Sequence, residues 1–79
     1  MKLKPLRTLK VNQKAVVRKV KATGELGRRI RDMGLLPGVI LQVIGRAPLK
    51  DPVALRLKGF TLTLRNNEAD YIEVEVLDE

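Results

Sequence analysis

Apolar side chains recur at every second position in two neighbouring segments, Val53–Lys58 and Phe60–Arg65. A period of two is typical of strands with one buried face, because successive side chains point to opposite faces of a sheet. If residues 58 and 59 form a two-residue turn, the apolar residues of both segments share one face. The pattern therefore predicts a β-hairpin with a buried face, in which Leu57 pairs with Phe60, Leu55 with Leu62 and Val53 with Leu64.

Three further segments have the composition of strands. In Ile72–Val76, apolar residues alternate with glutamates. Val39–Ile44 is β-branched and nearly apolar throughout, which predicts the most buried strand, apolar on both faces. Lys14–Lys21 predicts a strand whose alternation slips at residues 18 and 19, as at a β-bulge. Residues 66 and 67, both Asn, predict a turn before the last strand.

One segment, Thr23–Gly34, has a helical period, with Leu26, Ile30 and Met33 on one face. Thr23 is the expected N-cap, and Gly34 is the expected left-handed residue that ends the helix. The sequence thus predicts a mostly-β fold with about five strands and one short helix over about residues 24–33. Closure removes exposed strand edges, so we expect a small closed or nearly closed β-barrel in one domain, residues 1–79.

The chain contains no Cys, His, Ser or Trp. These absences exclude nucleophile–base pairs of the Ser–His and Cys–His kinds, zinc fingers and iron–sulfur clusters. We therefore expect no catalytic residue, no cofactor site and no metal site. The longest uncharged run, residues 33–45, is too short for a membrane span, which needs about 20 apolar residues. Basic residues also interrupt the N-terminal segment, so no signal peptide is predicted and a cytoplasmic location is expected.

The net charge of +7 is unevenly distributed. Residues 1–31 contain eleven bases and one acid, whereas residues 66–79 contain six acids and no base. The split indicates either a basic face for an acidic partner or internal pairing between the two ends of the chain. RNA binding by the basic third is a weaker alternative, because assigning Phe60 to the core leaves only Tyr71 for base stacking. The acidic residues are interpreted as a solvated strand face, since no loop has calcium-binding spacing.

Several short motifs follow one another along the chain. They comprise Arg29, Ile30, Met33, Gly34, Leu35, Pro37, Gly38, Ala47, Pro48, Leu49, Asp51, Pro52, Gly59, Phe60, Leu64, Arg65, Glu68 and Ala69. These motifs resemble those of the FeoA family, the small ferrous iron transport protein A of bacteria and archaea. The resemblance runs from about Pro5 to Leu77. The chain departs from the family pattern at Lys50, where a Gly is common, and at Asn12 and Gln13, which replace a frequent Pro-Gly.

The resemblance implies an SH3-like β-barrel and an accessory role in ferrous iron uptake. Its implied partner is the cytosolic GTP-binding part of the membrane transporter FeoB. No nucleic acid partner is expected, and contact with the membrane is expected only through the transporter. The same domain type occurs at the C-terminus of metal-dependent repressors. The alternative is therefore a stand-alone relative of that repressor domain. Weak self-association is compatible with the sequence. Carboxylates without imidazole or thiolate suit Mg²⁺ or Ca²⁺ better than Fe²⁺, so no dedicated iron site is expected.

The contact face is predicted from charge and from loop position. Basic side chains lie on the exposed side of the helix, and loops commonly carry binding residues. The candidate partner-binding residues are Arg28, Arg29, Arg31, Leu49 and Lys50.

Overall fold

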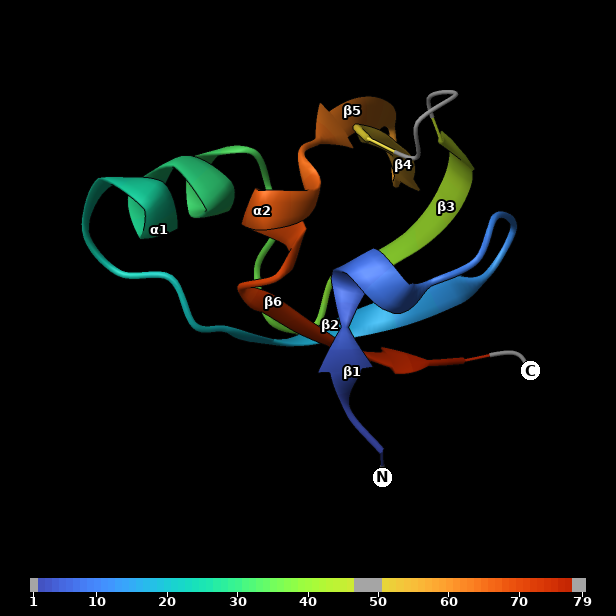
Figure 1. Cartoon of the computed structure of the whole chain (residues 1–79), viewed down its shortest axis with the longest axis horizontal. Coiled ribbons are helices and arrows are strands. Elements are labelled where there is room, and N and C mark those ends of the chain that lie inside the picture. The colour runs from blue at the N-terminus through green and yellow to red at the C-terminus, as the bar shows by residue number, and fades with distance from the viewer. Residues whose placement is uncertain (1, 47–50, 78–79) are drawn as a thin grey trace.

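A computed structural model of the chain describes residues 2–46 and 51–77. Six strands of this part form one antiparallel sheet (Figure 1). They are β1 (Lys4–Pro5), β2 (Lys14–Val20), β3 (Ile40–Arg46), β4 (Val53–Leu57), β5 (Phe60–Leu64) and β6 (Ile72–Val76). Their order across the sheet is β1-β6-β2-β3-β4-β5. The helices of the described residues are the 3₁₀ helix η1 (Leu6–Thr8), α1 (Gly24–Asp32) and α2 (Asn66–Ala69).

The prediction of a mostly-β chain with about five strands is confirmed in outline, but the closed or nearly closed barrel is wrong. The described chain has a sixth strand, β1, which is only two residues long and therefore leaves no periodic signal in the sequence. The sheet is also open, because β1 and β5 lie at its two ends and do not pair with each other. Helix η1, which follows β1, contacts both β6 and α2, so short helices rather than strand pairing cover part of the sheet (Figure 1).

The predicted hairpin of β4 and β5 is confirmed residue by residue. The register pairs Leu57 with Phe60, Leu55 with Leu62 and Val53 with Leu64. Gly59 has φ 89° in the turn, a left-handed conformation that glycine adopts without a Cβ clash. The predicted bulge in β2 is also confirmed, because the pairing with β6 shifts register between Val17 and Lys19.

Helix α1 matches its prediction closely at its C-terminal end. Gly34 has φ 98°, and the amides of Gly34 and Leu35 bond to the carbonyls of Arg31 and Ile30 at 2.9 and 3.3 Å. These two bonds form a Schellman motif, which satisfies carbonyls that the helix leaves open. Thr23 occupies the N-cap position, but its side chain makes no capping hydrogen bond.

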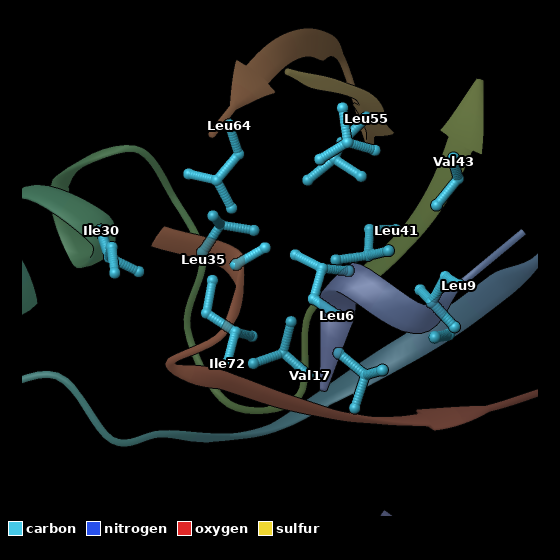
Figure 2. Packing of buried hydrophobic residues seen from close by; sticks show 14 of the residues in the cluster. Leu6, Leu9, Val17, Ile30, Leu35, Leu41, Val43, Leu55, Leu64 and Ile72 are labelled. Atoms are coloured by element: carbon cyan, nitrogen blue, oxygen red, sulfur yellow. The ribbon is translucent and has the colours of Figure 1, made fainter. Parts of the chain in front are cut away.

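The predicted turn at residues 66 and 67 is instead the short helix α2. The carboxylate of Glu68 reaches back to accept a hydrogen bond from the backbone N–H of Arg65 at 3.0 Å, which secures the first turn. Together these elements enclose a core of aliphatic side chains on the inner side of the curved sheet. Figure 2 shows side chains of the strands, η1, α1 and the segment after α1 meeting there.

Three of the predicted burial assignments differ from the structure. Phe60 is predicted to lie in the core but is 46% exposed, because it lies on the edge strand β5; its partner Leu57 on β4 is buried. Leu62 is only partly buried and packs against the edge of the core. Strand β3 is not buried on both faces: Leu41 and Val43 are buried, whereas Ile40 is 55% exposed.

Candidate interaction surface

Ion pairs connect the basic and acidic ends of the chain. Four pairs of the described chain each join a base from residues 1–31 to an acid from residues 66–79. This supports the interpretation of the charge asymmetry as internal pairing. The pairs are Arg7–Asp70 at 2.9 Å, Arg18–Glu75 at 2.9 Å, Lys21–Glu73 at 3.5 Å and Arg29–Glu68.

The acidic residues are therefore part of the fold. Glu73 and Glu75 lie half-buried on β6, each opposite a base of the N-terminal third. In the described ranges, 2–46 and 51–77, no group of three or more carboxylates is arranged to hold a metal ion. What stays available for a partner is the surplus of basic side chains.

The structure gives the three predicted arginines of α1 different environments. Arg28 is exposed and lines a shallow hollow with Glu25, Asp32 and Met33, so this part of the helix surface has mixed charge. Arg31 is exposed, and its guanidinium lies over Gly27. Arg29 is ion-paired with Glu68. Leu49 and Lys50, the other two predicted contact residues, lie outside the described residues.

The pair between Arg29 and Glu68 joins α1 to α2. The side chain of Glu68 is 8% exposed, whereas that of Arg29 is 62% exposed, so the carboxylate is buried beneath a guanidinium at the surface. One oxygen of Glu68 accepts from the backbone of Arg65 and the other faces Arg29. A buried carboxylate needs such partners, because burying a charge without them is costly. Arg29 thus has a structural role that its sequence neighbours lack.

Single substitutions of Arg29 and Arg28 test whether the structural role is specific to Arg29. We expect Arg29→Ala to lower the free energy of unfolding by about 1–2 kcal/mol, since it leaves the Glu68 carboxylate with one partner fewer. Exposure of the guanidinium to solvent keeps the loss below that of a fully buried pair. Arg28→Ala, the matched control, should change stability by less than about 0.5 kcal/mol. Urea denaturation measures both, and equal losses would contradict a structural role specific to Arg29.

An apolar groove lies between the segment that follows α1 and the tip of the β4–β5 hairpin. Its volume is about 360 Å³. Its floor contains two glycines, and the ring of Phe60 packs directly against Gly34, where an added Cβ would lie 3.0 Å from the ring carbon Cζ. The sequence does not indicate this groove, because the alternation of apolar residues in β5 places Phe60 in the core. The residues that line it are Gly34, Gly38, Val39, Ile40, Leu57, Lys58 and Phe60.

A tight turn over residues 36–39 shapes one wall of the groove. The amide of Val39 bonds to the carbonyl of Leu36 at 3.0 Å, and Gly38 has φ 96°. These features confirm the type II turn typical of a Pro-Gly sequence. Two bonds of 2.7 and 2.8 Å tie Gly38 and Val39 to Val17 of β2, so the turn is anchored to the sheet. Backbone hydrogen bonds therefore hold this wall of the groove, whereas hairpin side chains form the other wall.

Residues 4–76 match the family model of the FeoA domain. The chain belongs to the FeoA family. A relative from Porphyromonas gingivalis, the Fe(2+) transport protein A/Fe(2+) transporter FeoB fusion protein, is 36% identical over 72 residues. The aligned part is 91% of this chain but only 8% of that protein, so the chain spans a small part of its length. The FeoA family takes part in ferrous iron transport, and in this relative a FeoA segment and the FeoB transporter share one polypeptide.

Solved structures agree with this assignment. The NMR structure of a FeoA-like protein from Clostridium acetobutylicum has a TM-score of 0.93 and 39% identity, covering 100% of this chain and 92% of that one. FeoA of Stenotrophomonas maltophilia, solved with zinc and described as a prokaryotic SH3 domain protein, has a TM-score of 0.76 and 26% identity, covering 89% and 87%. The SH3-like fold implied by the family resemblance thus agrees with these neighbours, whereas the implied barrel is an open sheet in this structure.

The fold also occurs in a different functional context. A manganese-dependent transcriptional repressor in complex with manganese has a TM-score of 0.86, covering 98% of this chain and 38% of that one. Its identity is 20%, so the likeness concerns the fold alone.

Among the described residues of this FeoA chain, neither α-helix has the length and apolar character that a membrane span requires.

Proposed function

We propose that this FeoA chain is a non-enzymatic accessory protein of ferrous iron uptake that binds the cytosolic GTP-binding part of the transporter FeoB. The observation that carries the proposal is the relative in which a FeoA segment is covalently joined to FeoB. A covalent link holds two modules at millimolar effective concentration. Where the two are separate chains, a non-covalent interface has to bring them together in the cytoplasm.

The contact face proposed for this interface is the exposed side of α1 around Arg28 and Arg31. Both side chains are exposed, and neither takes part in the ion pairs that join the two ends of the chain. The chain has a net charge of +7, so an acidic surface on the transporter domain would accelerate association and orient it. Arg29 is less suited to contact a partner, because it already pairs with Glu68.

Titration of the chain into the purified cytosolic domain of FeoB from the same organism tests the proposal. We expect one-to-one binding in the micromolar range by calorimetry, about −8 kcal/mol at 1 μM. Running the titration with and without GTP, while hydrolysis is followed, shows whether the bound chain also changes the GTPase rate. Absence of binding at concentrations up to about 1 mM would contradict the proposal.

Charge reversal tests the contact face separately. The double variant Arg28→Glu with Arg31→Glu should weaken binding at least about tenfold, with stability changed by less than about 0.5 kcal/mol. The control is Lys10→Glu, in the segment before β2. The turn between η1 and β2 lies at the opposite end of the molecule from α1 (Figure 1). This single change alters the charge of a distant surface and should leave affinity nearly unchanged. If both proteins bind like the wild type, the α1 face is not the contact surface.

RNA binding is the second candidate, favoured by the exposed ring of Phe60 beside Lys58 in the groove. Against it, four bases of the N-terminal third pair with acids of the same chain and so have less charge to offer to phosphates. Salt distinguishes the two functions. An RNA complex that neutralises about six phosphates loses roughly a thousandfold in affinity between 50 and 200 mM salt. Micromolar RNA binding near 150 mM salt, without binding to the transporter domain, would favour RNA as the partner.

A further inference from the structure

The two edges of the sheet are protected to different degrees. Exposed edges present unpaired backbone groups, and natural proteins usually protect them with short strands, charges or proline. The edge strand β1 has only two residues, one a lysine and the other a proline. The other edge strand, β5, has five residues, Phe-Thr-Leu-Thr-Leu, without a charge or a proline. By these criteria the β5 edge is unprotected.

The register of the hairpin determines which backbone groups of β5 are free. Leu57 and Phe60 flank a two-residue turn, so they form a hydrogen-bonded pair, and such pairs alternate along an antiparallel ladder. Leu62 and Leu64 therefore bond to β4, whereas the N–H and C=O groups of Thr61 and Thr63 point away from it. Both threonines are exposed. In residues 2–46 and 51–77, no backbone bond from another element reaches either threonine.

The sequence of the hairpin is basic, although the carboxylates of Glu68 and Asp51 accept hydrogen bonds from the backbone N–H groups of Arg65 and Asn66 just after β5. Between Asp51 and Glu68 the chain contains three bases and no acid. Lys58 precedes β5 and Arg65 follows it, so a positive charge flanks each end of the edge. Arg56 lies opposite Thr61 on the neighbouring strand. A second copy paired with β5 would bring the same charges together on two molecules that each carry +7, which disfavours self-pairing.

One face of the edge is apolar. Phe60 and Leu62 are on the face of β5 that turns toward the core, yet Phe60 is 46% exposed and Leu62 only partly buried. Phe60 also lines the apolar groove, together with Gly34 and Ile40. In an added strand, every second side chain would lie beside these residues, because side chains alternate between the two faces.

We propose that the edge of β5 binds an extended segment of a partner protein by strand addition, and that this segment has apolar residues at alternate positions and acidic residues at its ends. The N–H and C=O groups of Thr61 and Thr63 would pair with its backbone. The groove at Phe60 would select apolar side chains, and Lys58 and Arg65 would select the acidic ends. Main-chain bonds supply affinity and pockets for alternate side chains supply specificity in this mode of recognition. The inference goes beyond the proposed function and does not require that the segment belong to FeoB.

The probe is a synthetic peptide, acetyl-Asp-Val-Thr-Val-Thr-Val-Asp-amide, and the measurement is amide exchange followed by NMR. In the free protein the amides of Thr61 and Thr63 should exchange rapidly, and those of Leu62 and Leu64 slowly. The peptide should slow the exchange of Thr61 and Thr63 and bind with a Kd below about 1 mM. The same peptide with Lys in place of both Asp residues should bind at least tenfold more weakly.

Backbone substitutions test strand addition itself. Thr63→Pro removes an N–H that the ladder to β4 does not use, a position where edge strands tolerate proline, and should weaken peptide binding at least tenfold. Thr63→Val keeps the N–H and is the matched control. Two N-methylated peptides repeat the test from the other partner, even if the proline variant fails to fold. Methylation of one alternate set of amides should abolish binding, and methylation of the other set should not.

Three results would overturn the proposal. The first is protection of Thr61 and Thr63 that rises with protein concentration in the absence of peptide, which would identify a second copy as the occupant. The second is peptide binding without slower exchange at these two amides. The third is an equal effect of the two N-methylated peptides. Because the probe is not a FeoB segment, these results leave the titration with the transporter domain as an independent test.

Discussion

Replacing Gly27 by alanine is expected to lower the free energy of unfolding by about 2–3 kcal/mol, or the melting temperature by about 10–20 °C. Gly27 is buried on α1, and a Cβ added there would lie 2.4 Å from the carbonyl oxygen of Ala22. The obstacle is backbone, so the segment before the helix has to move. Alanine improves helix propensity by about 1 kcal/mol, which does not offset an overlap of this size.

Gly45→Ala is the matched control for this substitution. Gly45 lies in β3, its φ is not left-handed, and no atom lies within 4 Å of an added Cβ. Alanine there should change stability by less than about 0.5 kcal/mol, or raise it slightly by restricting the unfolded chain. Thermal denaturation of both variants decides the matter. If Gly27→Ala is no more destabilising than Gly45→Ala, the packing of α1 does not require glycine at position 27.

Gly27 also illustrates what the sequence could not reveal. In sequence it is only an unfavourable residue inside a predicted helix, with a cost of about 0.5–1 kcal/mol. The structure requires glycine at this position, because the carbonyl of Ala22 approaches the helix so closely. This contact depends on the path of the chain as it enters α1. The end of the same helix was predictable, because the Schellman motif at Gly34 depends on residues adjacent in sequence.

Local patterns likewise explain which strands were predicted. The hairpin register was correct because two alternating segments and a two-residue turn leave one arrangement that places their apolar residues on one face. Strand β1 has no such pattern, since it exists only through its pairing with β6. Helix α2 was mistaken for a turn because its four residues are fixed by the buried carboxylate of Glu68 and by contact with η1.

The candidate contact residues show the same division. Exposure of Arg28 and Arg31 follows from the helical period, which places them away from Ile30. The pairing of Arg29 with Glu68 joins positions far apart in the chain, so no local pattern distinguishes Arg29 from its neighbours. The groove is not predictable for a related reason: Phe60 is in phase with the buried face of β5, but β5 is an edge strand, so Phe60 is exposed although its partner Leu57 is buried.

Ile30, near the C-terminal end of α1, is the fully buried side chain with which the helix enters the core. It is 0% exposed and belongs to the same cluster as Leu35, whose amide bonds to the Ile30 carbonyl at the end of the helix (Figure 2). Ile40, at the start of β3, is 55% exposed and lies in the apolar groove. The chain thus offers the same residue type in a buried and in an exposed position.

We expect Ile30→Ala to destabilise the protein by about 2–5 kcal/mol, because it removes buried methyl groups and leaves a cavity that the surrounding sheet cannot fill. Such a loss is a large part of the stability of so small a domain. Ile40→Ala should cost less than about 1 kcal/mol, since much of its side chain is already in water. Urea denaturation measures both, and amide exchange should show α1 loosened in the first variant only. Equal costs for the two substitutions would mean that other contacts, such as the Arg29–Glu68 pair with α2, hold α1 in place.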